Sequence, residues 1–256
     1  MEDNKYLEFE KLLRQYSNLT EEERNAFLVY KTSFFNLINS MSSIPNFMEL
    51  DNTILLKLID KKAIESCRRL EKTLKNPNNL FLKYSLFNKV DFSDDSSIIN
   101  FAKDTYRLID ESFSKIVLDK DLEVYRIVST DFDDIDSLSR GDLISTTLDK
   151  KQTLNFINND SKRVIFYKIK LSAGTPVIIS PYSVVNQYES QVDLILGNDN
   201  YVIKVMKSEK NRQKEILLSK KSLEYSINLE KVEMIDNQQF EYYEVTTRVK
   251  DNKKSL

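Results

Sequence analysis

The chain has 256 residues, of which 41% are hydrophobic and 30% are charged, so it is long and apolar enough to form a sizeable core. Its 38 Lys and Arg residues nearly balance its 40 Asp and Glu residues, and the net charge of -2 offers no basic field of the kind that holds nucleic acids. With no His and a single Cys, the sequence excludes internal disulfides, zinc clusters and the common Ser/His and Cys/His catalytic pairs. We therefore expect no metal and no nucleic-acid partner.

The sequence contains no segment with the pattern of a signal peptide or a transmembrane helix. Residues 1–16 are charged from the second position onward, and no window approaches the length of a membrane span. We therefore expect a cytoplasmic protein with no membrane partner, and delivery into a host cell by another route stays open. High Lys and Asn usage with only 3 Gly is typical of an AT-rich genome such as that of a phage, a virus or a low-GC bacterium.

The first part of the chain has the apolar spacing of α-helices, which runs through residues 5–74. Thr20 and Glu23 have the spacing of a capping box, which predicts a helix that begins at Glu21. A polar break at residues 91–97 supplies Asp and Ser residues that could cap a further helix. The sequence therefore predicts a helical part over residues 1–118.

From residue 122 onward the pattern changes to short, β-branched apolar runs between turn residues, which predicts strands. These runs cover residues 124–128, 143–147, 164–171, 177–179, 192–196 and 201–206. We interpret residues 207–214 as a solvated connector and expect residues 223–249 to complete the sheet. The predicted β-rich core spans residues 119–249, forms one domain with the helical part, and is followed by a frayed tail over residues 250–256.

Three of the strand-like runs carry polar side chains at positions where apolar ones are usual. Arg126 could bind a pyrophosphate with its planar guanidinium, although for Arg126 alone a solvent-facing position or a pair with Asp142 is the favoured interpretation. Ser145 and Thr147 share one strand face, where hydroxyls can bind a ribose or fix a carboxylate, although Thr is also a good strand former.

The third polar element precedes the apolar run 194–196. Gln191 and Asp193 share a strand face there, and alone they fit a polar edge at which a loop joins a core strand. Since Gly-rich phosphate-binding loops are lacking, any nucleotide has to be held by side chains and strand backbone. The three elements in this order, with a Tyr-rich loop before the last, favour a site that holds a dinucleotide and breaks a glycosidic bond.

Together these elements resemble the mono-ADP-ribosyltransferases of the arginine-serine-glutamate class, which include clostridial toxins and transferases of tailed phages. The resemblance covers residues 18–206 and includes a helix pattern at residues 19–39. Tyr125-Arg126 is similar to the first motif of the family, although Ile127 stands where Gly is usual. Ser145-Thr146-Thr147 is similar to its Ser-Thr-Ser motif.

The resemblance implies an α+β fold in which a helical N-terminal part precedes two packed, mainly antiparallel sheets that enclose an NAD cleft. It implies an NAD-dependent mono-ADP-ribosyltransferase, an enzyme that transfers ADP-ribose from NAD to a side chain of a target protein and releases nicotinamide. NAD is then a co-substrate, no metal is needed, and the protein is expected to be a monomer. The residues that would bind NAD are Tyr125, Arg126, Ser145, Thr146 and Thr147.

In the family, the last motif is Glu or Gln, any residue, and a catalytic Glu before an apolar run. Aligning that run with residues 194–196 makes Asp193 the catalytic acid, which Ser145 would orient, and Gln191 the residue that holds the acceptor. A register with Glu189 first and Gln191 at the catalytic position stays open. Gln at the first position favours acceptors other than arginine, and the residues implied in recognising the target are Tyr182, Tyr188, Glu189 and Gln191.

Asp193 is one methylene group shorter than the usual Glu. A catalytic group misplaced by about 1 Å can lower a rate on the order of 100-fold. A weakly active or inactive transferase fold that acts as a binding module therefore stays open as an alternative. An NAD glycohydrolase, a self-modifying enzyme and a scaffold unrelated to NAD are further alternatives.

Overall fold

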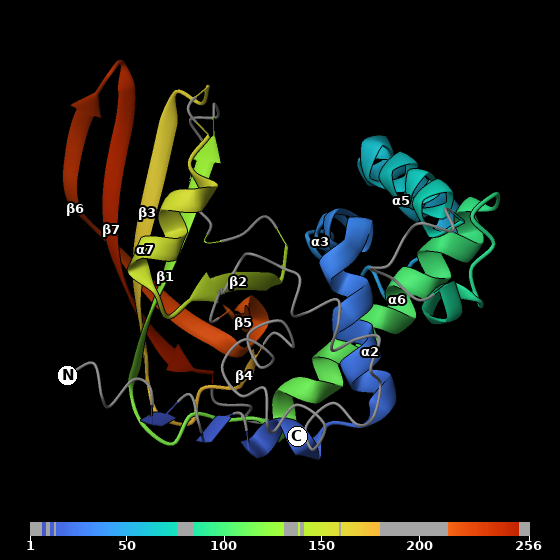
Figure 1. The fold of residues 1–256 in the computed structure, drawn as a ribbon, viewed down its shortest axis with the longest axis horizontal. Helices are drawn as coiled ribbons and strands as arrows, with labels where there is room; N and C mark the ends of the chain where they lie inside the picture. The colour runs from blue at the N-terminus through green and yellow to red at the C-terminus, as the bar shows by residue number, and fades with distance from the viewer. Residues whose placement is uncertain are drawn as a thin grey trace.

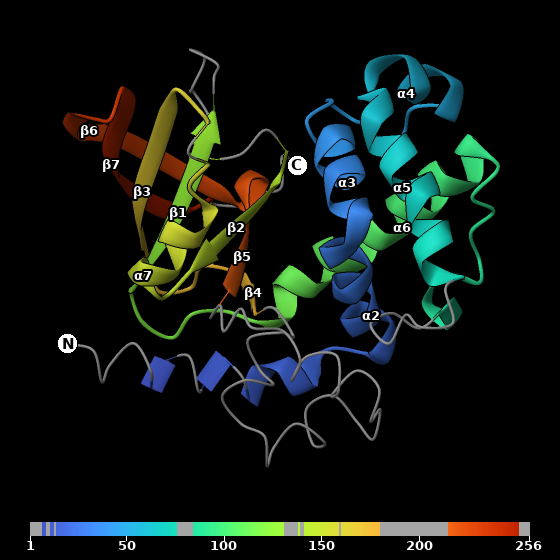
Figure 2. The ribbon, with the colours of Figure 1, turned by 45° about the horizontal axis from the view of Figure 1, so that its top comes forward.

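The structure is a computed structural model that describes residues 7–8, 11–12, 14–75, 84–130, 138, 141–158, 160–179 and 215–250. Helices of the first half of the chain form one layer and the strands form the other, as both views show (Figures 1 and 2). Buried side chains from both layers form one contiguous apolar core. The α+β class predicted from the sequence is therefore confirmed.

The helical layer consists of α-helices joined by short 3-10 or π segments. The α-helices are α2 (Glu21–Val29), α3 (Phe35–Ser42), α4 (Asn52–Leu58), α5 (Lys61–Leu74) and α6 (Asp95–Ser112). The short segments are η1 (Tyr16–Asn18), η2 (Tyr30–Phe34), η3 (Tyr84–Phe87) and η4 (Phe113–Lys115). In the part of the chain that the structure describes, no helix combines the length and the apolar character that crossing a membrane requires.

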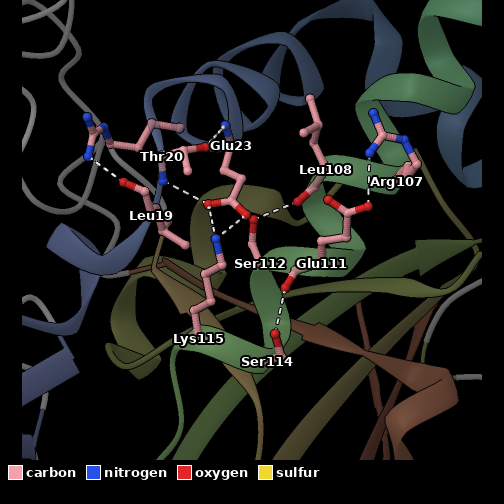
Figure 3. A network of polar contacts seen from close by, with 10 residues as sticks. Leu19, Thr20, Glu23, Arg107, Leu108, Glu111, Ser112, Ser114 and Lys115 are labelled. Atoms are coloured by element: carbon pink, nitrogen blue, oxygen red, sulfur yellow. Dashed lines mark hydrogen bonds and ion pairs between the residues drawn. The ribbon is translucent and has the colours of Figure 1, made fainter.

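The predicted capping box at the start of α2 is confirmed. Thr20 Oγ1 accepts from the backbone N–H of Glu23 at 3.2 Å, and the Glu23 carboxylate accepts from the backbone N–H of Thr20 at 2.8 Å. Lys115, just after α6, donates to both oxygens of the same carboxylate at 2.6 and 2.8 Å (Figure 3). The buried Glu23 side chain thus ties the start of α2 to the end of α6.

The strands form a seven-stranded sheet in the order β4-β5-β2-β1-β3-β7-β6. Their bounds are β1 (Leu122–Thr130), β2 (Leu143–Thr147), β3 (Arg163–Leu171), β4 (Val177–Ile179), β5 (Glu215–Ser219), β6 (Leu223–Ile235) and β7 (Gln238–Val249). Neighbours pair antiparallel except β3 and β7, which are parallel. The remaining short elements are α7 (Lys150–Thr153), η5 (Leu154–Phe156) and η6 (Lys220–Ser222).

The sequence predicts two packed sheets, whereas the described strands form one sheet that turns sharply between β1 and β2. These two strands pair at Tyr125 and Thr147 alone, and β2 runs away from β1 at an angle (Figure 1). By contrast, β1 and β3 pair along their whole length. Because β1 and β2 are joined at this one residue pair, the strands on the two sides of the junction can face different directions and still belong to one hydrogen-bonded sheet.

The two layers meet at the residues just before β2. A side chain at Gly141 would place its Cβ atom 2.6 Å from the backbone oxygen of Asn39 in α3, so only glycine fits this approach. The buried Asp142 carboxylate accepts from the Tyr106 hydroxyl at 2.8 Å and from the Ser219 hydroxyl at 3.0 Å. Helices α3 and α6 are thereby fixed against β2 and β5.

Candidate active site

Arg126 lies in β1, opposite Tyr167 of β3. Its Nη1 atom donates to the backbone oxygen of Ser145 at 2.7 Å, and its Nε atom is buried without a hydrogen-bond partner among the described residues. Burial lowers the pKa of Arg126, while nearby Tyr30, Tyr167 and Glu215 act in the opposite direction. The guanidinium remains a cation near neutral pH, and its contact is with Ser145 and not with Asp142.

Ser145 in β2 contacts Glu215, the first residue of β5. The two strands pair with Thr147 opposite Glu215 and Ser145 opposite Leu217, so Ser145 and Glu215 are diagonal neighbours. The Ser145 hydroxyl donates to Glu215 Oε1. Because Glu215 is only 2% exposed, its carboxylate is enclosed and held in one orientation by the sheet.

Two residues of η2 complete this cluster from the helical layer. Lys31 Nζ donates to both oxygens of Glu215, at 2.7 and 2.6 Å. Tyr30 is fully buried, and its hydroxyl accepts from Asn39 Nδ2 at 3.4 Å. Burial raises the pKa of Tyr30, the Asn39 hydrogen bond and the charge of Arg126 lower it, and the charge of Glu215 raises it. Tyr30 is therefore neutral at physiological pH and lies within electrostatic reach of both charged residues.

The other predicted NAD-binding side chains contact the sheet itself. Tyr125 donates its hydroxyl to Glu123 and packs its ring 6.0 Å from that of Phe166. Thr146 is buried and donates to the Ile216 backbone oxygen at 2.7 Å. Thr147 Oγ1 accepts from the backbone N–H of Asp149 at 3.2 Å. The structure thus brings Arg126 and Ser145 together. The side chains of Tyr125, Thr146 and Thr147 instead contact other residues in or next to the sheet.

The remaining predicted site residues lie outside the described part of the chain. These residues are Tyr182, Tyr188, Glu189, Gln191 and Asp193. Their assignment to catalysis and target recognition stays a prediction.

Glu215 belongs to this cluster, and the interpretation of the sequence missed it. Gln213-Lys214-Glu215 stands before Ile216-Leu217-Leu218, which is the Gln, any residue, acid and apolar-run pattern of residues 191–196, with Glu in place of Asp. Interpreting residues 207–214 as a connector concealed this second copy of the pattern. The signal that could have revealed it is the Glu itself, because the family motif ends in Glu.

Comparisons with known proteins give similarities of structure only. No protein-family model matches the chain, and no curated protein matches it either. Among solved structures, the chain is similar to an ADP-ribosyltransferase from Clostridium botulinum, with 15% identity, 96% of both chains covered and a TM-score of 0.44.

Two further similar structures come from other bacteria. The Vis toxin, an ADP-ribosyltransferase from Vibrio splendidus, is 11% identical over 100% of this chain and 90% of its own, with a TM-score of 0.43. A protein from S. aureus, whose crystal structure was solved with NAD, is 15% identical over 75% of this chain and 97% of its own, with a TM-score of 0.36. The chain thus resembles ADP-ribosyltransferases in the order of its sequence motifs and is similar to such proteins in structure.

Proposed function

We propose that this protein is an NAD-dependent mono-ADP-ribosyltransferase in which Glu215 is the catalytic carboxylate. The observation that supports the proposal is the meeting of a guanidinium, a hydroxyl and an enclosed carboxylate from three strands, at Arg126, Ser145 and Glu215. A cation to hold phosphate and a fixed carboxylate to stabilise positive charge are what cleavage of a dinucleotide at its ribose requires.

Two buried polar atoms in this region suit a ligand of the NAD type. Arg126 Nε is a donor and Asn39 Oδ1 is an acceptor, and both are buried without a hydrogen-bond partner among the described residues. Phosphate oxygens of a dinucleotide could accept from the first, and its hydroxyl or amide groups could donate to the second. Buried polar atoms without partners are costly, so a ligand that satisfies both would gain affinity.

In the proposed reaction, Glu215 accepts a hydrogen bond from the ribose 2′-hydroxyl and stabilises the positive charge that develops at C1′. The bond between C1′ and the nicotinamide nitrogen breaks, and its electron pair leaves with nicotinamide, which becomes neutral. An oxygen or nitrogen atom of the acceptor then bonds to C1′ and releases its proton. Ser145 keeps the Glu215 carboxylate in the required orientation through its hydroxyl.

The acceptor in this proposal is a side chain of a target protein. Gln213 stands two positions before Glu215 and takes the role of holding the acceptor, which the register with Asp193 as the catalytic acid gives to Gln191. In the family that the sequence resembles, Gln at this position favours acceptors other than arginine. Tyr182, Tyr188 and Glu189 keep their proposed role in recognising the target protein.

An active enzyme is favoured over an inactive binding module. The binding-module alternative rests on Asp193, whose side chain is one methylene group shorter than that of Glu. Glu215 supplies the longer Glu side chain that the motif requires. An NAD glycohydrolase uses the same groups without an acceptor protein.

The experiment incubates the purified protein with labelled NAD, with and without a cell lysate, and measures both nicotinamide release and label on protein. We expect label on a lysate protein, and loss of both signals with Glu215→Gln. Nicotinamide release without labelled protein would identify a glycohydrolase. A folded native protein that releases no nicotinamide would contradict the proposal.

A further inference from the structure

The helix that leads into the site is interrupted beside Lys31. Between α2 and α3, Thr32 has φ -96° and ψ -160°, which is not helical, and its hydroxyl donates to the Val29 backbone oxygen at 2.6 Å. Interruptions of this kind inside helices occur frequently at functional sites. Here the interruption adjoins the residue whose ammonium group contacts Glu215.

The two side chains of the ion pair between Lys31 and Glu215 differ in their exposure to solvent. The Lys31 side chain is 24% exposed, whereas the Glu215 side chain is 3% exposed. The other ionisable groups described around this carboxylate are Tyr30, which is buried and neutral, and Arg126, which donates to the Ser145 carbonyl oxygen. Among the described residues, Lys31 is therefore a cation in direct contact with Glu215.

An enclosed carboxylate is costly to keep ionised unless a cation or several donors satisfy it. Lys31 donates to both oxygens and Ser145 donates to one, so the carboxylate is held by hydrogen bonds from the helical layer and from the sheet. Two donors from different layers fix the rotation of the carboxylate. A carboxylate that has to meet a ribose needs a fixed orientation.

We propose that Lys31 is a positioning residue for the transfer reaction, which holds the Glu215 carboxylate in the orientation that the reaction requires. This proposal rests on the proposed function. An ammonium group close to a developing positive charge also opposes the reaction through repulsion. The sign of the effect of removing Lys31 therefore decides whether the residue supports or restrains catalysis.

The test compares Lys31→Met and Lys31→Arg with a matched control, Lys115→Met. Lys115 also donates to both oxygens of a buried Glu, at Glu23, but at the far end of α2. Nicotinamide release from NAD gives kcat and KM for each folded variant. If Lys31→Met does not fold, Lys31→Gln takes its place, because it keeps a hydrogen-bond donor without the charge.

We expect Lys31→Met to lower kcat at pH 7 on the order of 10-fold or more, with little change in KM for NAD. Lys31→Arg should restore most of kcat, because it keeps donors that can reach both carboxylate oxygens. Lys115→Met should leave kcat unchanged.

A Lys31→Met variant with a native or a higher kcat would overturn the role of Lys31 alone. The same holds if Lys31→Arg is no better than Lys31→Met. A native protein that releases no nicotinamide would instead overturn the proposed function, and the role of Lys31 with it.

Discussion

The hydroxyl of Ser145 donates to a carboxylate oxygen of Glu215, although the two residues lie 70 positions apart in the sequence. The pairing of β2 with β5 sets this contact, since it places Thr147 opposite Glu215 and Ser145 on the diagonal. A site whose groups stand on paired strands is held more accurately than one that stands on loops. The geometry proposed for catalysis is therefore a property of the sheet.

Ser145→Ala tests the orienting hydrogen bond. We expect kcat for nicotinamide release to fall on the order of 10-fold to 100-fold, because the Glu215 carboxylate loses the donor on the sheet side. KM for NAD should change little. The measurement is steady-state nicotinamide release at several NAD concentrations.

The matched control is Thr146→Val, which removes the neighbouring hydroxyl that donates to the Ile216 backbone oxygen at 2.7 Å. This change should lower the free energy of unfolding by about 1 kcal/mol and leave kcat unchanged. Equal losses of kcat in the two variants would show that any damage to β2 impairs the reaction, and the specific role of Ser145 would be refuted.

Arg126→Lys tests phosphate binding, because lysine keeps the charge but loses the planar fork of donors. Loss of one charge-assisted hydrogen bond corresponds to about 1.5–3 kcal/mol, so KM for NAD should rise about 10-fold to 100-fold. The control is Arg163→Lys in the neighbouring strand, where the guanidinium contacts Glu241 at 3.0 and 2.7 Å. Arg163→Lys should lose stability and keep its KM for NAD. An unchanged KM for NAD in Arg126→Lys would show that Arg126 does not bind NAD.

Glu23→Gln tests the link between α2 and α6. Burial acts to raise the pKa of Glu23, but the hydrogen bonds from Lys115 and Thr20 outweigh it, so the pKa lies below its ordinary value of 4.5. A lowered pKa in the folded state stabilises the fold above pH 4.5, and this contribution is lost as the pH falls through the folded-state value.

We therefore expect Glu23→Gln to unfold with a free energy about 1–3 kcal/mol lower than the native protein at pH 7. The difference should shrink as the pH falls below 4.5. Urea unfolding at pH 7 and at lower pH values provides the measurement. A difference that stays constant over this range would show that the charge of Glu23 contributes nothing to stability.

Local features could be predicted from the sequence because they depend on neighbours in the chain. The capping box of Thr20 and Glu23 is confirmed, and the strands over residues 143–147 and 177–179 have the predicted bounds. Arg126 and Ser145 could be identified because polar side chains in apolar strands are unusual. The contact between these two residues is the part of the predicted site that the described structure brings together.

The sequence offers two candidates for the partner carboxylate, because residues 191–196 and 213–218 carry the same pattern, and the Glu in the second copy is the one local signal that favours it. Only the pairing of β5 with β2, a contact between distant segments, places Glu215 beside Ser145. Lys31 could not be predicted as a partner of Glu215 because the two residues lie 184 positions apart in the sequence and belong to different layers.

The most direct test measures nicotinamide release by Glu215→Gln and by Asp193→Asn side by side. Each change removes a negative charge and keeps the size of the side chain. If Glu215 is the catalytic carboxylate, Glu215→Gln should lose on the order of 100-fold or more in kcat, whereas Asp193→Asn should stay within about threefold of the native rate. The reverse result, with activity lost in Asp193→Asn and kept in Glu215→Gln, would contradict the proposed site.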